Sequence, residues 1–353
     1  SHDWRNTTTP YGPLHLWMGN AVTHLVGDHV AAGIIVYKVI SVLGFAAIAW
    51  SIPRLARSIG GDPALALWLG VANPVMILHL IGGMHNESVM VGLVSVGLLA
   101  AVHRRFHASL LLIGIAVSLK ATAIIAAPFI VWLMVHHWAP EGTRVLKRVG
   151  AFLMAGALAV AEVAVTVAAI TWASGSSWGW LSQISGNSKV INPLAGPTLL
   201  ADVLVPPIQF FSPDTTYNGV LGALRSAGMV LMLLGLVLVW WWGRTGVRRA
   251  IAATAAAYQV AFVFNSVTLP WYYASVLTLM GTFRPPLSII KLTTGAALFI
   301  GVAFAGDGNH QLYNWFWVIG MVVVAWFATQ WIFAGVPDSA ATPAKKPTPA
   351  RAE

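Results

Sequence analysis

The chain has 353 residues, of which 58% are hydrophobic and only 9% are charged, and its mean hydropathy is +0.75. An ordinary soluble domain carries roughly 25% charged residues, so this composition excludes a soluble globular protein and predicts an integral membrane protein. The absence of cysteine excludes disulfides, thiolate metal sites and a cysteine nucleophile. The net charge of +9 would suggest a nucleic-acid partner in a soluble protein, but here we interpret it as a topology signal and expect no nucleic acid.

Three regions follow from the distribution of polar residues along the chain. Residues 1–29 begin polar and are predicted to form an outer loop followed by a short interfacial helix. Residues 30–335 are predicted to form a transmembrane bundle, whose longest polar connection, 175–218, is a candidate substrate-facing outer loop. Residues 336–353, rich in Ala, Pro and Lys, are predicted to be a disordered inner tail.

Hydropathy predicts an all-α, polytopic bundle with about ten membrane segments, some of them short or broken, since one crossing needs roughly twenty residues. A proline removes a helix hydrogen bond, so we expect a kink at Pro74. The apolar runs are 30–52, 63–81, 88–102, 109–138, 150–173, 220–242, 251–269, 271–283, 289–305 and 313–334.

The run 109–138 is too long for one crossing. If it crossed once, the following loop with Arg144, Lys147 and Arg148 would lie on the opposite face from the earlier basic loops, against the positive-inside rule. Two short helices that meet near Lys120 place all these loops on one side. Lys120 then lies at or near the outer face.

In this arrangement of membrane crossings, a few cations do not lie on the inner side. An isolated charge at a helix centre costs about 2.5 to 3.5 kcal/mol even on a lenient scale, so three cations at similar depth indicate partners or an anion. Glu162 is the only carboxylate within the apolar runs and can neutralise one of them. The cations left over favour a bound phosphate, which at this depth would belong to a lipid carrier. The cations in question are Arg5, Lys38, Lys120, Lys189 and Arg225, of which Lys38, Lys120 and Arg225 lie within apolar runs.

Simpler explanations exist for these three cations. Lys38 and Arg225 could extend to the outer lipid headgroups while their aliphatic stems stay in the apolar layer. Lys120, at the tip of a short helical hairpin, could cap a helix C-terminus.

The stretch from Gly82 to Glu87 lies between two apolar runs and is the candidate rim of an active site. A histidine, an amide and a carboxylate are costly to bury at a membrane boundary and unnecessary in a plain loop. His85 alone would be more typical of a structural histidine. Beside Asn86 and Glu87, with Gly82 and Gly83 allowing close backbone approach, it favours substrate binding.

A second candidate contact is the aromatic run that follows Pro270. Trp271 and Tyr272 offer flat surfaces suited to stacking on a sugar ring. An aromatic belt at the membrane interface explains them almost equally well.

Several short motifs, taken together, resemble the actinobacterial polyprenol-phosphate-mannose-dependent alpha-1,6-mannosyltransferases of the GT-C superfamily. No single motif is specific, and the resemblance lies in their order from Trp4 to about Trp271. The motifs are Trp4-Arg5-Asn6, Pro10-Tyr11-Gly12-Pro13-Leu14, Gly82-Gly83-Met84-His85-Asn86-Glu87, Leu119-Lys120-Ala121, Pro128-Phe129 and Pro270-Trp271-Tyr272.

The resemblance implies a multi-pass enzyme of the cell membrane that extends the mannan of lipomannan and lipoarabinomannan. It would take mannose from a polyprenyl monophosphate carrier on the outer side and pass it to a mannan or lipid-linked mannan acceptor. The chain departs from the family in having Glu87 where an aspartate is common. The family's acidic residue in the first outer loop, its expected general base, would lie upstream of Ser1 together with the first helix.

An inverting transfer from a β-linked lipid phosphate needs a base for the acceptor hydroxyl and cations for the leaving phosphate. Glu87 is the candidate base within this sequence, and no cofactor or metal is required because protein cations can stabilise the phosphate. The candidate phosphate contacts are Lys120, Arg225, Lys38 and Arg5. The candidate sugar or acceptor contacts are His85, Asn86, Tyr11, Trp271 and Tyr272.

The alternative from another class is a transporter or flippase of a lipid-linked sugar. Such a protein would expose its site to both faces and often contains internal repeats, whereas the polar residues here gather on one side. A purely structural role is a third possibility, favoured if no acidic residue lies beside Lys120.

Overall fold

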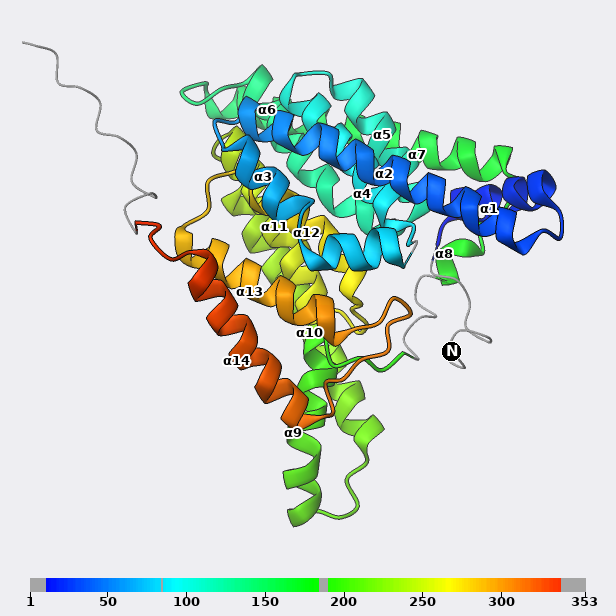
Figure 1. Ribbon diagram of the computed structural model, residues 1–353. Coiled ribbons are helices and arrows are strands. Elements are labelled where there is room, and N and C mark those ends of the chain that lie inside the picture. Colours follow the sequence, from blue (N-terminus) through cyan, green and yellow to red (C-terminus); the bar gives the residue numbers. More distant parts are fainter. Residues whose placement is uncertain (1–10, 84, 184–189, 338–353) are drawn as a thin grey trace, which may run out of the picture.

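The computed structural model describes residues 11–83, 85–183 and 190–337, and within these ranges the chain is helical, with two isolated β-bridges and no strand. Figure 1 shows the arrangement of the helices. The elements are α1 (Pro13–Val26), α2 (Val30–Ser58), α3 (Pro63–Gly70), the π-helix η2 (Met76–Gly82), α4 (Glu87–Val102), α5 (Phe106–Leu119), the 3-10 helix η3 (Ala121–Ala126), α6 (Ala127–Trp138), α7 (Val145–Ala173), α8 (Trp180–Gln183), α9 (Gly196–Phe211), α10 (Tyr217–Trp242), α11 (Val247–Phe264), the 3-10 helix η5 (Pro270–Tyr273), α12 (Ala274–Met280), α13 (Leu287–Ala303) and α14 (Trp315–Ile332).

Five of the described helices are long and apolar enough to cross a membrane, or six if the bent pair η2 and α4 forms one span. The prediction of an all-helical membrane protein is thus confirmed, while the prediction of about ten membrane segments is not. The five candidate spans are Val30–Ser58, Ala121–Trp138, Val145–Ala173, Tyr217–Trp242 and Trp315–Ile332.

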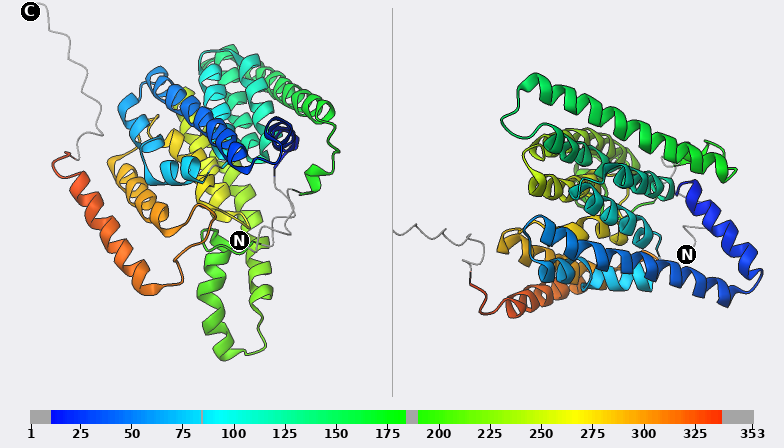
Figure 2. Two further views of the ribbon diagram at one scale, coloured as in Figure 1. Left: turned by 45° about the vertical axis from the view of Figure 1, so that its right-hand side comes forward. Right: turned by 90° about the horizontal axis from the view of Figure 1, so that it is seen from above.

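The α2 helix packs closely against α4. A Cβ added at Gly44 would lie 2.6 Å from the Ser88 backbone, and one added at Gly92 would lie 2.8 Å from the Gly44 carbonyl oxygen. Small residues at this crossing let the two backbones approach, as is common between membrane helices. Seen from above, α7 and α14 lie at opposite edges of the bundle with α2 between them (Figure 2).

Contacts between connecting segments define one end of the bundle, which we call the basic end. There the Arg248 side chain donates to the carbonyl oxygens of Ile59 and Gly60, and Ser58 is hydrogen-bonded to His103. The neighbouring arginines in sequence, Arg57 and Arg104 among them, therefore gather at this end. Since α4 runs from Glu87 to Val102, Glu87 lies about 24 Å away at the opposite end.

The helical hairpin predicted in the run 109–138 is confirmed. The α5 helix ends at Leu119 and the chain turns at Lys120 through η3 into α6. The Phe106 ring, at the start of α5, lies 5.9 Å from the His137 ring and 6.1 Å from the Trp138 ring at the end of α6. The chain therefore returns to the end from which it came, and Lys120 lies at the tip.

The run 63–81 does not form the single kinked helix that we predicted. The α3 helix ends at Gly70, and helical structure resumes only at Pro74, continuing as a π-helix from Met76. The Asn73 side chain explains the break. It donates to the Leu69 carbonyl and accepts from the Met76 amide, so these two backbone groups do not form the hydrogen bonds of a continuous helix.

The segment predicted as an outer loop, 175–218, contains the helix α9 of sixteen residues. The α9 helix and the first part of α10 form a hairpin that projects from the rest of the bundle (Figures 1 and 2). Within the segment 1–29, the structure contains the helix α1.

Candidate active site

Glu87 and Lys120 form a buried ion pair at the end of the bundle opposite the basic end. Glu87 is the first residue of α4 and is fully buried, and Lys120, at the tip of the α5–α6 hairpin, is 4% exposed. The Lys120 Nζ donates to the Glu87 Oε1. Removing two charges from water is unfavourable unless each is paired, so the position of each side chain depends on the other.

We predicted a bound phosphate from an excess of outer cations over carboxylates, and that excess is smaller than predicted. Lys120 is neutralised by Glu87, which lies outside the apolar runs and was not counted as its partner. Glu162, which we expected to neutralise one of the outer cations, is instead paired with His107 at the start of α5. Both pairings join residues from separate parts of the fold and so could not be read from spacing in the sequence.

The second carboxylate oxygen of Glu87, Oε2, is buried and has no hydrogen-bond partner within the described part of the chain. A buried acceptor without a partner is unfavourable by about 1 to 3 kcal/mol, and more when it is charged. Such an oxygen is suited to accept a proton or a hydrogen bond from a bound hydroxyl group.

Two tyrosine rings enclose the ammonium group of Lys120. Its Nζ lies 3.7 Å from the centre of the Tyr272 ring and 5.6 Å from that of Tyr11. Both contacts have the geometry of cation–π interactions, which strengthen as water is excluded. Burial and the nearby Glu87 carboxylate raise the pKa of the Tyr11 phenol well above its ordinary value, so this side chain is a neutral hydrogen-bond donor.

Backbone contacts hold Tyr11 against the hairpin tip. Tyr11 and Lys120 form an isolated antiparallel β-bridge, and the Gly12 amide donates to the Leu119 carbonyl at 3.0 Å. A Cβ added at Gly12 would lie 2.2 Å from the Ser118 carbonyl oxygen, so only glycine allows this approach. The two motifs around Tyr11 and Lys120, far apart in sequence, thus form one structure.

His85 stacks on Trp271 with 3.6 Å between the ring centres and 16° between their planes. Its Nε2 donates to the Gly306 carbonyl at 2.7 Å. A Cβ added at Gly83 would lie 2.7 Å from the His85 ring, so a larger residue would not fit at this position. Gly82 has no comparable neighbour. His85 therefore joins the turn before α4 to the segment between α13 and α14.

The open aromatic platform that we predicted at Trp271 and Tyr272 is not present in this arrangement. Trp271 is 4% exposed and one face is covered by His85, while Lys120 covers a face of Tyr272. Stacking between protein side chains occupies the faces that we assigned to a sugar.

His15 is a further residue of the candidate site that the sequence reasoning missed. The Asn86 Nδ2 donates to the His15 Nδ1, and the His15 ring lies 4.4 Å from the Tyr11 ring. Burial lowers the pKa of His15, so its imidazole is neutral and able to accept this hydrogen bond. Its position four residues after Tyr11, in the first turn of α1, was the signal in the sequence.

Two predicted phosphate contacts lie apart from the pair. The Lys38 Nζ donates to the Ile81 carbonyl at 2.8 Å, beside the turn that carries His85. The Arg225 guanidinium donates to the carbonyls of Val190 at 3.0 Å and Ser266 at 3.3 Å. Of the remaining predictions, Arg5 and Lys189 lie outside the described residues.

An apolar groove of about 610 Å³ runs between α6 and α7 next to the hairpin tip. Val117, at the end of α5, and Ile124, in η3, line it on either side of Lys120 in sequence. The other lining side chains are also apolar, among them Val131, Val163 and Trp240. The buried charged pair and the groove thus share the tip of one helical hairpin.

Comparison with known families and proteins places this geometry in context. Residues 1–136 match the family described as "Alpha-(1->6)-mannopyranosyltransferase, N-terminal domain", and residues 197–334 match "MptB C-terminal domain". No solved structure matches significantly.

Two curated proteins are similar over nearly the whole chain. Alpha-(1->6)-mannopyranosyltransferase A of Corynebacterium glutamicum is 56% identical over 99% of this chain and 73% of its own length. The protein of the same name from Mycobacterium tuberculosis is 34% identical over 92% of this chain and 63% of its own length. The chain belongs to the alpha-(1->6)-mannopyranosyltransferase family.

Proposed function

We propose that this protein transfers mannose from a polyprenyl-phosphate-mannose donor to the growing end of an alpha-1,6-linked mannan. The observation that carries the proposal is the buried Glu87–Lys120 pair, with one carboxylate oxygen unpartnered and an apolar groove at the same hairpin tip. A base, a cation and a lipid-sized apolar surface are the three parts that this reaction requires.

In the proposed reaction, a hydroxyl oxygen of the acceptor attacks C1 of the donor mannose. The new glycosidic C–O bond forms as the bond from C1 to the phosphate oxygen breaks, and the bonding electrons leave with the phosphate. Glu87 Oε2 accepts the hydroxyl proton, and Lys120 stabilises the charge on the departing lipid phosphate. Protonation of the carboxylate and release of a phosphate anion balance the charge.

The direct pairing of the two side chains couples these roles. While Glu87 is ionised, it holds Lys120 through Oε1. When Glu87 takes up the proton its charge is lost, and the ammonium group becomes available to the phosphate at the same moment. A carboxylate whose cation partner moves to a phosphate is in turn a better proton acceptor, so the two events assist each other.

The groove between α6 and α7 supports a lipid donor rather than a soluble sugar nucleotide. Its lining is almost wholly apolar, which suits a polyprenyl tail, and its end near Val117 and Ile124 would place the lipid phosphate near Lys120. Each buried CH₂ group of the tail would contribute about 0.8 kcal/mol. We place the acceptor on the same side, at the outer surface of the membrane.

The decisive experiment uses membranes bearing the full-length protein, polyprenyl phosphate carrying radiolabelled mannose, and an alpha-1,6-mannan acceptor. We expect label in the acceptor as a new glycosidic bond, and loss of that product in Glu87→Gln and Lys120→Met. Glu162→Gln, which changes the partly exposed pair with His107, is the control. Label that crosses the bilayer without a new bond would instead establish a transporter.

A further inference from the structure

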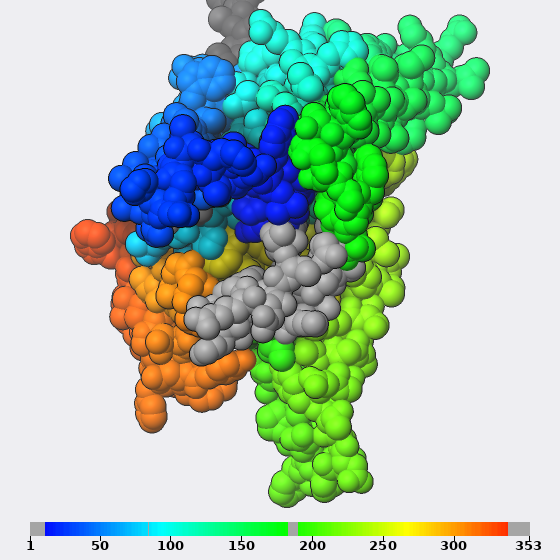
Figure 3. Space-filling model, turned by 90° about the vertical axis from the view of Figure 1, so that its right-hand side faces the viewer, coloured from blue at the N-terminus to red at the C-terminus, as the bar shows by residue number. Residues whose placement is uncertain are grey.

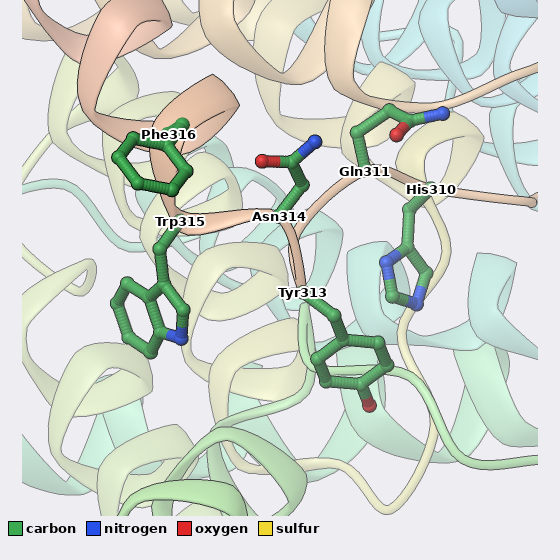
Figure 4. A pocket seen from close by; sticks show the side chains of 6 residues that line it. All are labelled: His310, Gln311, Tyr313, Asn314, Trp315 and Phe316. Carbon is green, nitrogen blue, oxygen red and sulfur yellow. The ribbon is translucent and has the colours of Figure 1, made fainter.

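A hollow outside the candidate active site lies where the chain enters α14. It has a volume of about 590 Å³ and is open to the surroundings. We call it the aromatic hollow, and Figure 4 shows its lining side chains, His310, Gln311, Tyr313, Asn314, Trp315 and Phe316.

Three of the four rings that line the aromatic hollow share one side of this segment, and the Phe316 ring points the other way. In Figure 4, the side chains of His310, Tyr313 and Trp315 project toward the α9–α10 hairpin, and those of Gln311 and Asn314 point the other way. The Trp315 side chain is 70% exposed, so its ring is available to a ligand. This differs from Trp271, whose ring is covered.

A carboxylate lies beside these rings. Asp202, in α9, accepts from the Tyr217 hydroxyl at 2.7 Å and from the Tyr313 hydroxyl at 3.3 Å. The His310 ring lies 5.0 Å from the Tyr313 ring. One carboxylate therefore joins α9, α10 and the segment before α14, and fixes the Tyr313 ring at the edge of the hollow.

A short turn connects the aromatic hollow to the candidate active site. Phe304 and His310 form an isolated β-bridge, and the turn between them places Gly306 as the acceptor for His85. A Cβ added at Gly308 would lie 3.4 Å from the Trp271 ring, so this turn also packs on the indole. One side of a single turn thus contacts the candidate site, and the residue that closes the turn lines the hollow. The part of the chain that contains this turn, orange in Figure 3, is visible on the same face of the molecule as α1.

The chemistry of the hollow favours a carbohydrate chain. Pyranose rings place apolar C–H faces on aromatic rings and exchange hydrogen bonds between their hydroxyls and carboxylate, imidazole or amide groups. An interfacial belt would explain tryptophan and tyrosine alone, but a carboxylate and a histidine in the same cluster are costly against lipid.

We propose that the aromatic hollow binds the mannan acceptor at sugar units behind the one that reacts. The inference rests on the proposed function, since the occupant is the acceptor of that reaction. A chain that crosses the turn 304–310 would present its end near Glu87 while its earlier units stack on Trp315 and Tyr313. The hollow would then make longer acceptors better substrates than short ones.

The test compares acceptors of different length in the protein and its Trp315→Leu variant, which keeps an apolar side chain and loses the flat ring. We expect the ratio of kcat/KM for an alpha-1,6-mannotetraose acceptor to that for a single mannoside to fall about tenfold, the scale of one lost stacking contact. Trp331→Leu, at the other end of the same helix and 81% exposed, is the matched control, and its ratio should match that of the unmodified protein. Tyr313→Phe, which keeps the ring and loses the bond to Asp202, is the second variant, and we expect an intermediate ratio.

A binding measurement separates this inference from the proposed function. Calorimetric titration of the purified protein with alpha-1,6-mannotetraose should show binding that weakens about tenfold in Trp315→Leu but not in Trp331→Leu. If no membrane preparation transfers mannose, the proposed function fails while this titration still decides the hollow. Equal tetraose binding in all variants, or equal losses in both tryptophan variants, would overturn the inference and leave the hollow as part of the membrane interface.

Discussion

Glu87 at the start of α4 and Lys120 at the tip of the α5–α6 hairpin are paired side chain to side chain in a site that excludes solvent from both. The pair joins two motifs that are 33 positions apart in sequence. It is also the only ion pair with both members buried among the residues that the structure describes, since the Glu162–His107 pair is partly exposed.

We expect single substitutions of this pair to be destabilising and their combination to be much less so. Glu87→Gln or Lys120→Met leaves an uncompensated buried charge, at a cost of about 3 to 5 kcal/mol, whereas the double variant leaves none. Thermal unfolding in detergent measures the stability, and mannose transfer measures the activity. The double variant should regain much of the stability and none of the activity.

The control for this cycle is Glu162→Gln, which should change stability by less than about 1 kcal/mol because His107 is 82% exposed. If the double variant were as unstable as the single ones, the contribution of the pair would lie in packing rather than charge. Mannose transfer by that double variant would show that neither Glu87 nor Lys120 takes part in the reaction.

Gly12→Ala should separate Tyr11 from the hairpin tip. The added methyl group would lie 2.2 Å from the Ser118 carbonyl oxygen, so the segment that carries Tyr11 and His15 must move. We expect transfer activity to fall by at least tenfold, since displacement of site residues by about 1 Å can cost a hundredfold. Gly222→Ala in α10, where nothing lies within 4 Å, is the control and should retain activity.

Filling the apolar groove should weaken donor binding selectively. Gly156, on α7, lines the groove and has no neighbour within 4 Å of an added Cβ, so Gly156→Leu adds volume there without a clash in the backbone. We expect KM for a long-tailed polyprenyl-phosphate-mannose to rise several-fold, with a smaller change for a short-tailed analogue. Gly150→Leu, on the same helix but outside the groove, is the matched control. An equal effect on both donor lengths would argue against a tail in this groove.

The pH dependence of transfer should reflect His15. Burial disfavours its charged form and lowers its pKa below the ordinary value near 6.5, although the nearby Glu87 carboxylate opposes part of that effect. Protonation would turn Nδ1 from an acceptor into a donor and break the hydrogen bond from Asn86. Activity should therefore persist as the pH falls through 6.5 and decline only at lower values.

The His15→Gln variant checks this assignment, because an amide oxygen accepts a hydrogen bond at any pH. We expect its activity to depend less on pH across the acid range than that of the unmodified protein. If the decline of activity at acid pH were the same in this variant as in the unmodified protein, the titrating group would not be His15.

Local hydropathy was enough to predict the class of fold and the hairpin, since both depend on the length of apolar runs and the side on which cations lie. It failed at the run 63–81, where hydrogen bonds of the Asn73 side chain replace the helical pattern. It also could not show that the segment 175–218 contains a helix, α9, because Pro206 and Pro207 within it are typical of loops.

The sequence by itself determined a membrane protein of helices and the motifs around Tyr11, His85, Lys120 and Trp271. These features are local, because they depend on which residues are near one another in the chain. Only the tertiary structure decided that Glu87 neutralises Lys120, that His85 covers Trp271 and that His15 holds Asn86. Each of these contacts joins separate helices or turns, and the partner of a buried charge or ring is set by the packing of the bundle.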